Sequence, residues 1–218
     1  MTGSSLFTDE DVRRISEAVR NAEQATSGEI VPYVVGRSDS YPEAIWRAGA
    51  LGAFAALFAF AVADLVSARW LPFSIAEIAL IAAACFAIAA ALVAAIPRTR
   101  MWLIHATIEQ QRVDERASLA FLSEEVFRTR ERTGILILVS LLEHRVSVLG
   151  DAGINAKVDK KEWDEVVRFV VDGMKRGTPA DGLVNAIALC GSILERHGVE
   201  IRPDDTNELR DTLRMSER

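Results

Sequence analysis

Two apolar runs decide the fold of this chain: AGALGAFAALFAFAVA at residues 48–63 and IALIAAACFAIAAALVAAI at residues 78–96. Neither run contains a charged side chain. A membrane-spanning helix needs roughly 20 predominantly apolar residues to cross about 30 Å of hydrocarbon. The second run has this length by itself, and the first reaches it when Arg47 and Asp64 at its ends extend into the headgroup region. The pattern therefore predicts a transmembrane helical hairpin.

The positions of three tryptophans favour the same interpretation. Trp46 precedes the first run, Trp70 lies in the connection and Trp102 follows the second run. Amphipathic rings of this kind settle at membrane interfaces. The alternative is a buried helical hairpin inside a soluble protein, which the many alanines allow. The rest of the sequence is too charged and too amphipathic to enclose two such helices, so we favour the membrane hypothesis.

Basic residues indicate how the hairpin is oriented. Those that flank its outer ends are Arg37, Arg47, Arg98, Arg100 and Arg112, whereas the connection carries Arg69 alone. Positively charged residues near membrane spans stay on the cytoplasmic side. We therefore expect a protein of a cell inner membrane with two spans and with both chain ends in the cytoplasm.

Composition excludes some classes of protein. The formal net charge is -6, and the acidic residues are spread along the chain, so nucleic acid is not an expected partner. Cys85 lies inside the second apolar run and Cys190 in a helical pattern, and neither has a partner at metal-ligand spacing. The pattern gives no indication of an oxidising compartment.

The segment before the hairpin predicts a helix and a strand. Thr8 is the expected N-cap of the helix, with Asp11 in the position of a capping box, and the helix should end near residues 27–28. Residues 29–35 are rich in β-branched side chains and predict a strand. Because Pro32 cannot donate to a ladder, we expect an edge strand or a bulge there.

The segment after the hairpin predicts helices around two further strands. A long amphipathic helix should follow Pro97, with a break near residues 114–118. Residues 135–140 are continuously apolar, which indicates a strand covered on both faces, and residues 146–150 should pair with it as an antiparallel hairpin. Two helices are expected over residues 160–174 and 179–197. The chain after Pro203 is polar, which predicts a marginal helix or a frayed tail.

Several short motifs lie outside the hairpin. They are TSGEIV (26–31), TGILILVSL (133–141) with Glu143, VLGDAGI (148–154), Trp163 and DGL (181–183). With these motifs in this order, the chain resembles the TPM domain family. The resemblance covers the chain outside the hairpin and implies an α/β/α sandwich with a small mixed sheet. The expected organisation is a first part of the domain at 1–43, a transmembrane hairpin at 44–97, a second part at 98–200 and a polar tail at 201–218.

The resemblance also implies a range of functions. Some members of the family are acid phosphatases or bind divalent cations, and others act as accessory factors for membrane complexes. Relatives with Asp-Asn-Gly before the central strand offer a metal ligand there. This chain has Arg132-Thr133-Gly134 instead, which puts that ligand in doubt.

Three carboxylates are candidate metal ligands. Asp151 closes a strand at the rim of the sheet, and Glu143 and Asp159 could add oxygen ligands for Ca²⁺ or Mg²⁺. In the alternative that we favour, Asp151 caps a turn for which Gly153 supplies a positive φ. Glu143, His144 and Arg145 could form a catalytic trio, but three polar residues in a hairpin turn are more typical of a solvated loop.

The sequence by itself does not establish an enzyme, because it contains no nucleophile with a base at recognisable spacing and no phosphate-binding glycine loop. Our leading hypothesis is a membrane-anchored TPM-like domain that acts as a binding or accessory factor for a membrane protein complex. Its partners would be the lipid bilayer and a membrane protein. The alternative is a divalent-metal-dependent phosphatase that uses Asp151.

Overall fold

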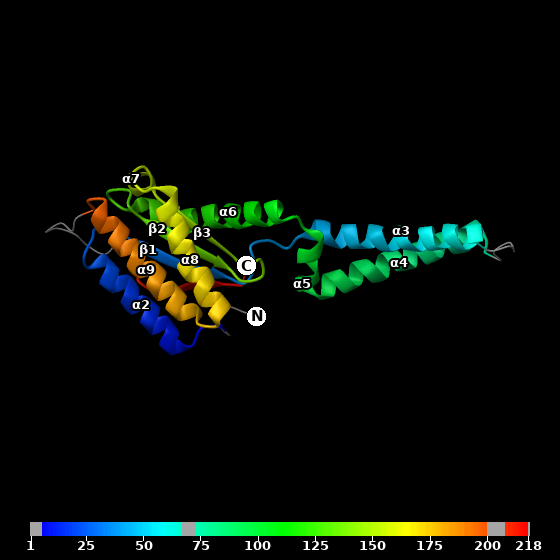
Figure 1. Ribbon diagram of the computed structural model, residues 1–218, viewed down its shortest axis with the longest axis horizontal. Helices are drawn as coiled ribbons and strands as arrows, with labels where there is room; N and C mark the ends of the chain where they lie inside the picture. The colour runs from blue at the N-terminus through cyan, green and yellow to red at the C-terminus, as the bar shows by residue number, and fades with distance from the viewer. Residues whose placement is uncertain (1–5, 67–72, 200–207, 218) are drawn as a thin grey trace. The chain divides into compact units, whose positions relative to one another are not determined.

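The computed structural model describes residues 6–66, 73–199 and 208–217, and Figure 1 shows its helices and strands. The chain divides into two compact units, of which one combines Met1–Asp39 with Gln110–Arg218 and the other is Ser40–Glu109. We call the first unit the sandwich and the second the hairpin unit.

A four-stranded mixed sheet organises the sandwich. Its strand order is β3-β2-β1-β4, in which β1 pairs in parallel with β2 and β4, and β2 pairs antiparallel with β3. The register places Ile30 opposite Ile135, so strands on either side of the hairpin in sequence are neighbours in the sheet. The elements are α2 (Asp9–Glu23), β1 (Ile30–Val35), α6 (Ala106–Ser123), η2 (Val126–Arg128), β2 (Ile135–Ser140), β3 (Arg145–Gly150), α7 (Ala152–Asn155), α8 (Lys160–Arg176), α9 (Pro179–Arg196) and β4 (Arg214–Ser216).

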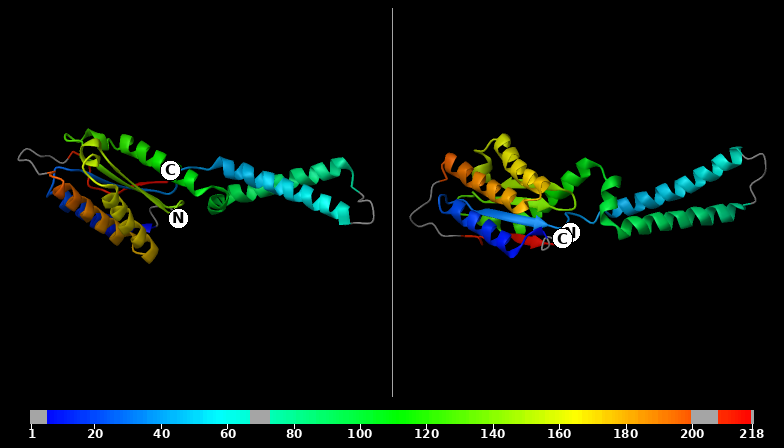
Figure 2. Two further views of the ribbon diagram at one scale, coloured as in Figure 1. Left: turned by 45° about the horizontal axis from the view of Figure 1, so that its top comes forward. Right: turned by 60° about the horizontal axis from the view of Figure 1, so that its bottom comes forward.

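Helices cover both faces of this sheet, because successive side chains of a strand point to opposite faces. Ile135 and Ile137 of β2 pack into a core with α2, α8 and α9, whereas Leu136 and Leu138 pack against α6. Figure 2 shows these two helical layers on opposite sides of the strands. Every residue of β2 is buried, as its continuous apolar sequence predicts. The predicted α/β/α sandwich with a small mixed sheet is therefore confirmed.

The two long C-terminal helices of the sandwich cross at a pair of glycines. A Cβ added to Gly182 of α9 would lie 2.9 Å from the Cα of Gly173 in α8 and 2.9 Å from the carbonyl oxygen of Phe169. The helix backbones meet here without a side chain between them. Pro179 begins α9, at the residue where the sequence predicts this helix to start, and Thr178 is its N-cap residue.

Pro32 lies in a different setting from the one that the sequence predicts. The edge-strand prediction is wrong, since β1 lies between β2 and β4. The Glu29 carbonyl accepts from the Ile135 N–H of β2, whereas the Gly36 N–H donates to the Ser216 carbonyl of β4. Because bonding directions alternate along a parallel strand, Pro32 faces the β4 side, before the point where the pairing with β4 begins. The missing N–H of Pro32 is therefore tolerated inside the sheet.

Two other predictions of local structure are wrong. Helix α6 continues through residues 114–118, where the Ser118 hydroxyl donates to the Asp114 carbonyl. The interruption comes earlier, where Ile104 has an extended backbone. The tail is also more ordered than predicted, because Arg214–Ser216 forms β4. Residues 201–207 and 218 of the predicted tail lie outside the described residues.

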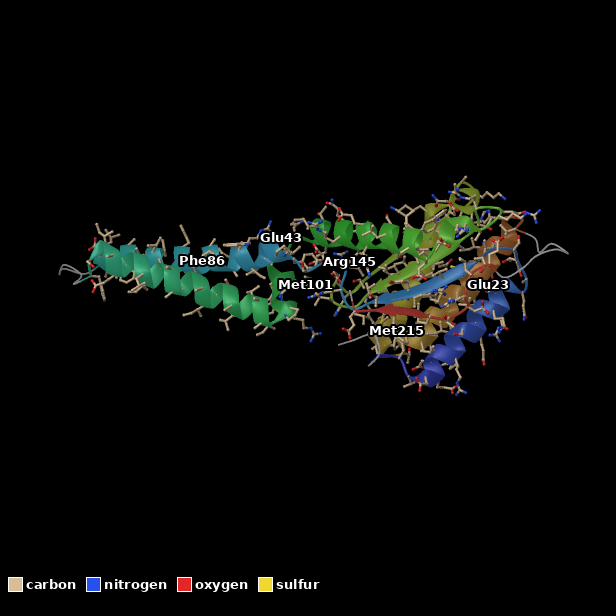
Figure 3. All side chains as sticks on the ribbon, turned by 180° about the vertical axis from the view of Figure 1, so that it is seen from behind. Glu23, Glu43, Phe86, Met101, Arg145 and Met215 are labelled. Carbon is tan, nitrogen blue, oxygen red and sulfur yellow. The ribbon has the colours of Figure 1, made fainter. Side chains whose placement is uncertain are left out.

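Two long apolar helices build the hairpin unit. They are α3 (Pro42–Val66) and α4 (Ile75–Ala95), followed by α5 (Pro97–Arg100) and a 3-10 turn, η1 (Met101–Leu103). A Cβ added to Gly52 of α3 would lie 2.8 Å from the carbonyl oxygen of Cys85 in α4, so the helices are closely packed. Many side chains of the two helices project outward (Figure 3), and Phe54 is 67% and Leu80 is 71% exposed.

Residues 96–104 form a folded segment at the end of α4, which we call the collar. Ile104 packs with Tyr41 and Ala44 in a small apolar core. The buried guanidinium of Arg100 donates to the carbonyls of Ala94 at 2.7 Å, Val93 at 3.3 Å and Ser40 at 2.6 Å. This side chain satisfies carbonyls that the end of a helix leaves without an intrahelical partner. The collar explains why this unit, at residues 40–109, is longer than the hairpin expected at 44–97.

Candidate functional site

Asp151 lies directly after β3 and is 4% exposed. Its Oδ2 accepts from Nε of Arg132 at 2.6 Å, and its Oδ1 accepts from Nη2 of Arg132 at 3.0 Å and from the Ala152 N–H at 2.6 Å. The hydrogen bond with Asp151 raises the pKa of Arg132. Asp151 therefore caps α7, and both of its oxygens are held by protein donors.

Gly153 supports this cap in a way that the sequence did not predict. It is not one of the positive-φ glycines among the described residues, which are Gly177 and Gly198. A Cβ at Gly153 would lie 2.2 Å from the Glu131 carbonyl oxygen. The expectation of a positive φ is wrong, and glycine is needed because two backbone segments approach closely.

Glu143 lies in the connection before β3 and is buried, with 6% of its surface exposed. One carboxylate oxygen accepts from the Ser38 N–H at 2.9 Å, and the other accepts from the Ser140 hydroxyl. The Ser38 hydroxyl donates to the Ser140 oxygen at 2.8 Å. These groups stand where the parallel strands β1 and β2 end, and they tie the two strand ends together.

The two residues after Glu143 differ from it in exposure. His144 is exposed and has a φ of 53°, and the Arg145 guanidinium donates to the side-chain oxygen of Gln110 at 3.3 Å. The interpretation as a solvated loop is thus wrong for the buried Glu143, whose carboxylate has a structural role.

Asp159 is the N-cap residue of α8. Its N–H donates to the Glu162 carboxylate at 3.3 Å. Glu162 also contacts Nε2 of His197 at 2.9 Å, and this hydrogen bond lowers the pKa of Glu162. Asp159 and its partner therefore fix the start of α8 against the end of α9.

The structure does not bring the three predicted ligands together. Glu143 precedes β3, Asp151 follows it, and Asp159 lies beyond α7 at the start of α8. Within residues 6–66, 73–199 and 208–217, no three Asp, Glu, His or Cys side chains are grouped closely enough to hold a metal ion. The role of these carboxylates in binding Ca²⁺ or Mg²⁺ stays a prediction.

A second carboxylate centre lies at the start of β1, which is the end of the strand away from Glu143. Glu23 at the end of α2 accepts from the Ile30 N–H at 2.9 Å, and Glu29 accepts from the Glu208 N–H at 2.9 Å. The other oxygen of each carboxylate is buried without a hydrogen-bond partner among the residues that the structure describes. Burial raises the pKa of Glu23 to about 8 and also raises that of Glu29. Figure 3 labels Glu23.

Sequence reasoning missed the chemistry of this centre and of the Asp151 pair. Glu29 stood in a recognised motif, but nothing local indicates that residues near 208 return to it. Arg132 was noted as a departure from the family pattern. Its position where relatives carry an acidic ligand could have suggested a partner for Asp151.

Together these features define a class of protein, an α/β/α sandwich interrupted by a long apolar helical hairpin between its two central parallel strands. The model of the TPM domain family matches residues 90–193. This match confirms the resemblance seen in the sequence, and it covers a little under half of the chain.

A solved structure has the same fold. The NMR structure of BA42 protein from the psychrophilic bacterium Bizionia argentinensis is similar with a TM-score of 0.56 and 20% sequence identity, over 95% of this chain and 94% of that chain. No curated protein matches the chain in sequence.

Proposed function

We propose that this protein is a membrane-anchored TPM-domain protein whose helices α3 and α4 cross the bilayer. The observation that carries the proposal is the outer surface of the hairpin. Both helices are long and apolar enough to span a membrane, and only 6% of the most apolar 18-residue window of each is buried. Apolar patches of this extent on a protein surface mark an interaction site, and lipid is the partner whose chemistry fits.

The interfacial residues support the same proposal. Trp46 and Trp102 are 67% and 87% exposed near the ends of the two helices, and Trp70 lies outside the described residues. The excess of arginine at this end of the hairpin favours a location in the cytoplasm for both ends of the chain, in the inner membrane of a bacterium.

Within this proposal the sandwich acts as a binding or accessory factor for a membrane protein complex. Its best candidate carboxylates, Asp151 and Glu143, are engaged by hydrogen bonds that stabilise the fold. This arrangement favours a binding role over the alternative of metal-dependent phosphate-ester hydrolysis.

Cysteine labelling tests the anchor. In a background with Cys85→Ala and Cys190→Ala, Ser67→Cys in the connection should react with an impermeant maleimide in intact spheroplasts. Glu217→Cys should react only after permeabilisation. The reverse labelling pattern would show the opposite topology, with both chain ends outside the cytoplasm. Extraction of the protein from membranes by alkaline carbonate would reject the anchor.

A second pair of assays tests the role of the sandwich. Cross-linking in membranes followed by solubilisation should recover one membrane protein in fixed proportion to the wild-type chain. Hydrolysis of a phosphate ester by the purified protein that requires Mg²⁺ or Ca²⁺ and is lost in Asp151→Asn would instead support the phosphatase.

A further inference from the structure

The collar presents residues outward that its own folding does not use. Trp102 is 87% exposed and Ile96 is 50% exposed. The Arg98 side chain is exposed, and it has no hydrogen-bond or ion-pair partner within the part of the chain that the structure describes. An exposed indole and an unpaired guanidinium therefore stand four residues apart on one short folded segment.

The length of α4 sets the depth of the collar in a bilayer. The helix has 21 residues, which at about 1.5 Å per residue spans about 31 Å, close to the hydrocarbon thickness of about 30 Å. A helix that fills the hydrocarbon layer places the residues after Ala95 at the level of the headgroups. Arg98 and Trp102 would then meet lipid phosphates and the boundary of the acyl chains.

The charges at this end of the hairpin unit also fit an anionic surface. The charged residues are Glu43, Arg47, Arg98, Arg100 and Glu109. Arg100 is buried with its donors on three carbonyls, and Arg47 donates to the Leu103 carbonyl at 2.8 Å. Arg47 is exposed and keeps its charge, whereas Arg98 is the arginine of this group whose donors have no partner among the described residues.

We infer that the collar is a lipid-binding element, in which Arg98 binds the phosphate of an anionic headgroup and Trp102 inserts at the headgroup boundary. The inference rests on the proposed membrane anchor and adds to it the lipid class and the residues that select it. The internal carbonyl contacts of Arg100 hold the collar rigid, so the depth of the hairpin is fixed by a folded structure.

Fluorescence quenching tests the position of the collar. A variant that keeps Trp102 as its single tryptophan, through Trp46→Phe, Trp70→Phe and Trp163→Phe, is reconstituted into phosphatidylcholine and phosphatidylglycerol vesicles. Lipids brominated near the headgroup should quench Trp102 more strongly than lipids brominated near the chain end. Stronger quenching by deep bromines, or none by either, would overturn the inference.

Lipid selectivity is tested in the same variant by placing bromine on one lipid class at a time, at equal total fractions. Brominated phosphatidylglycerol should quench Trp102 roughly two- to fivefold more than brominated phosphatidylcholine. Arg98→Gln should bring this ratio close to one, and Arg98→Lys should keep part of it. Arg168→Gln, which removes an exposed arginine of α8, is the matched control and should leave the ratio unchanged. A ratio that survives Arg98→Gln rejects the role of Arg98.

A further probe separates this inference from the anchor itself. In a chain without other tryptophans, Phe54→Trp places an indole on the exposed face of α3. Deep quenching of that probe without shallow quenching of Trp102 would reject the collar inference while the anchor stands. If neither probe is quenched, the anchor and the collar inference both fail.

Discussion

Glu23 is a carboxyl group whose charge depends on pH near neutrality. Burial is the main cause of its raised pKa of about 8, and the nearby Glu29 and Asp211 raise that pKa further, whereas the cation of Arg214 and the hydrogen bond from Ile30 lower it. In the unfolded chain the same group titrates near 4.5. Between these two pKa values the folded state binds more protons than the unfolded state, so raising the pH destabilises the fold.

The neutral variant Glu23→Gln should remove most of this dependence. We expect the free energy of unfolding of the wild type to fall by on the order of 2 kcal/mol from pH 5 to pH 8, and that of the variant to fall by less. Some dependence should remain, because Glu29 also has a raised pKa. Denaturant unfolding in detergent across this pH range measures the effect.

Glu17→Gln, on an exposed position of the same helix, is the control for the loss of one negative charge. Its pH profile should follow that of the wild type. Equal slopes for wild type and Glu23→Gln would contradict the assignment of a proton to Glu23 at neutral pH.

Residue patterns predicted which polar side chains stand out, but not their partners. Asp151 was identifiable because it follows an apolar strand beside a glycine. Its ion pair with Arg132 spans 19 residues and depends on a φ of 59° at Arg132, which no local pattern indicates. Likewise, Glu143 in a polar tripeptide predicted a solvated turn, whereas contacts with Ser38, 105 residues away in sequence, bury it.

At the scale of elements, the crossing of α8 and α9 is a contact that leaves no room for an added side chain. Gly182→Ala would place a methyl group against the backbone of α8, so the two helices must move apart or the backbone must distort. We expect a loss of about 1 to 3 kcal/mol in the free energy of unfolding, measured by thermal melting. Ser192→Ala, on an exposed position of α9, should change it by less than about 0.5 kcal/mol. A Gly182→Ala variant as stable as this control would disprove tight backbone contact.

Elements with strong local patterns were predictable, and those defined by distant partners were not. Continuous apolar sequence predicted β2, and Pro179, which favours the first turn of a helix, predicted the start of α9. Strand β4 has the sequence Arg-Met-Ser, which contains no β-branched or aromatic residue. It forms a strand because it pairs with the edge of β1 that faces away from β2. Pro32 is tolerated inside the sheet because β4 is too short to pair with it.

At the scale of the whole molecule, the sandwich should fold without the hairpin unit. Asp39 and Arg112 form an ion pair at 3.1 Å, so the ends left by removing Ser40–Glu109 lie near each other. A flexible linker of about eight residues, which spans roughly 15 Å on average, should join them. We expect a soluble chain with one cooperative melting transition.

The same shortened chain with Ile137→Asp, a charge in the doubly covered strand, serves as the unfolded reference. If the shortened chain resembles this reference in its circular dichroism and melting, then the sandwich needs the hairpin unit in order to fold. The two compact units would then not be independent folding units.

The place of the hairpin between β1 and β2 also sets the order of events on the ribosome. Ser38 leaves the ribosome 105 residues before Glu143, to which it bonds at the strand ends. At a synthesis rate of roughly 5 to 20 residues per second, this delay is roughly 5 to 20 s. Under the proposed membrane anchor, the apolar hairpin is delivered to the translocon during that time, while β1 has no partner strand. On this proposal, targeting to the membrane precedes closure of the sandwich, because β1 gains its partner strand β2 only after the hairpin has left the ribosome.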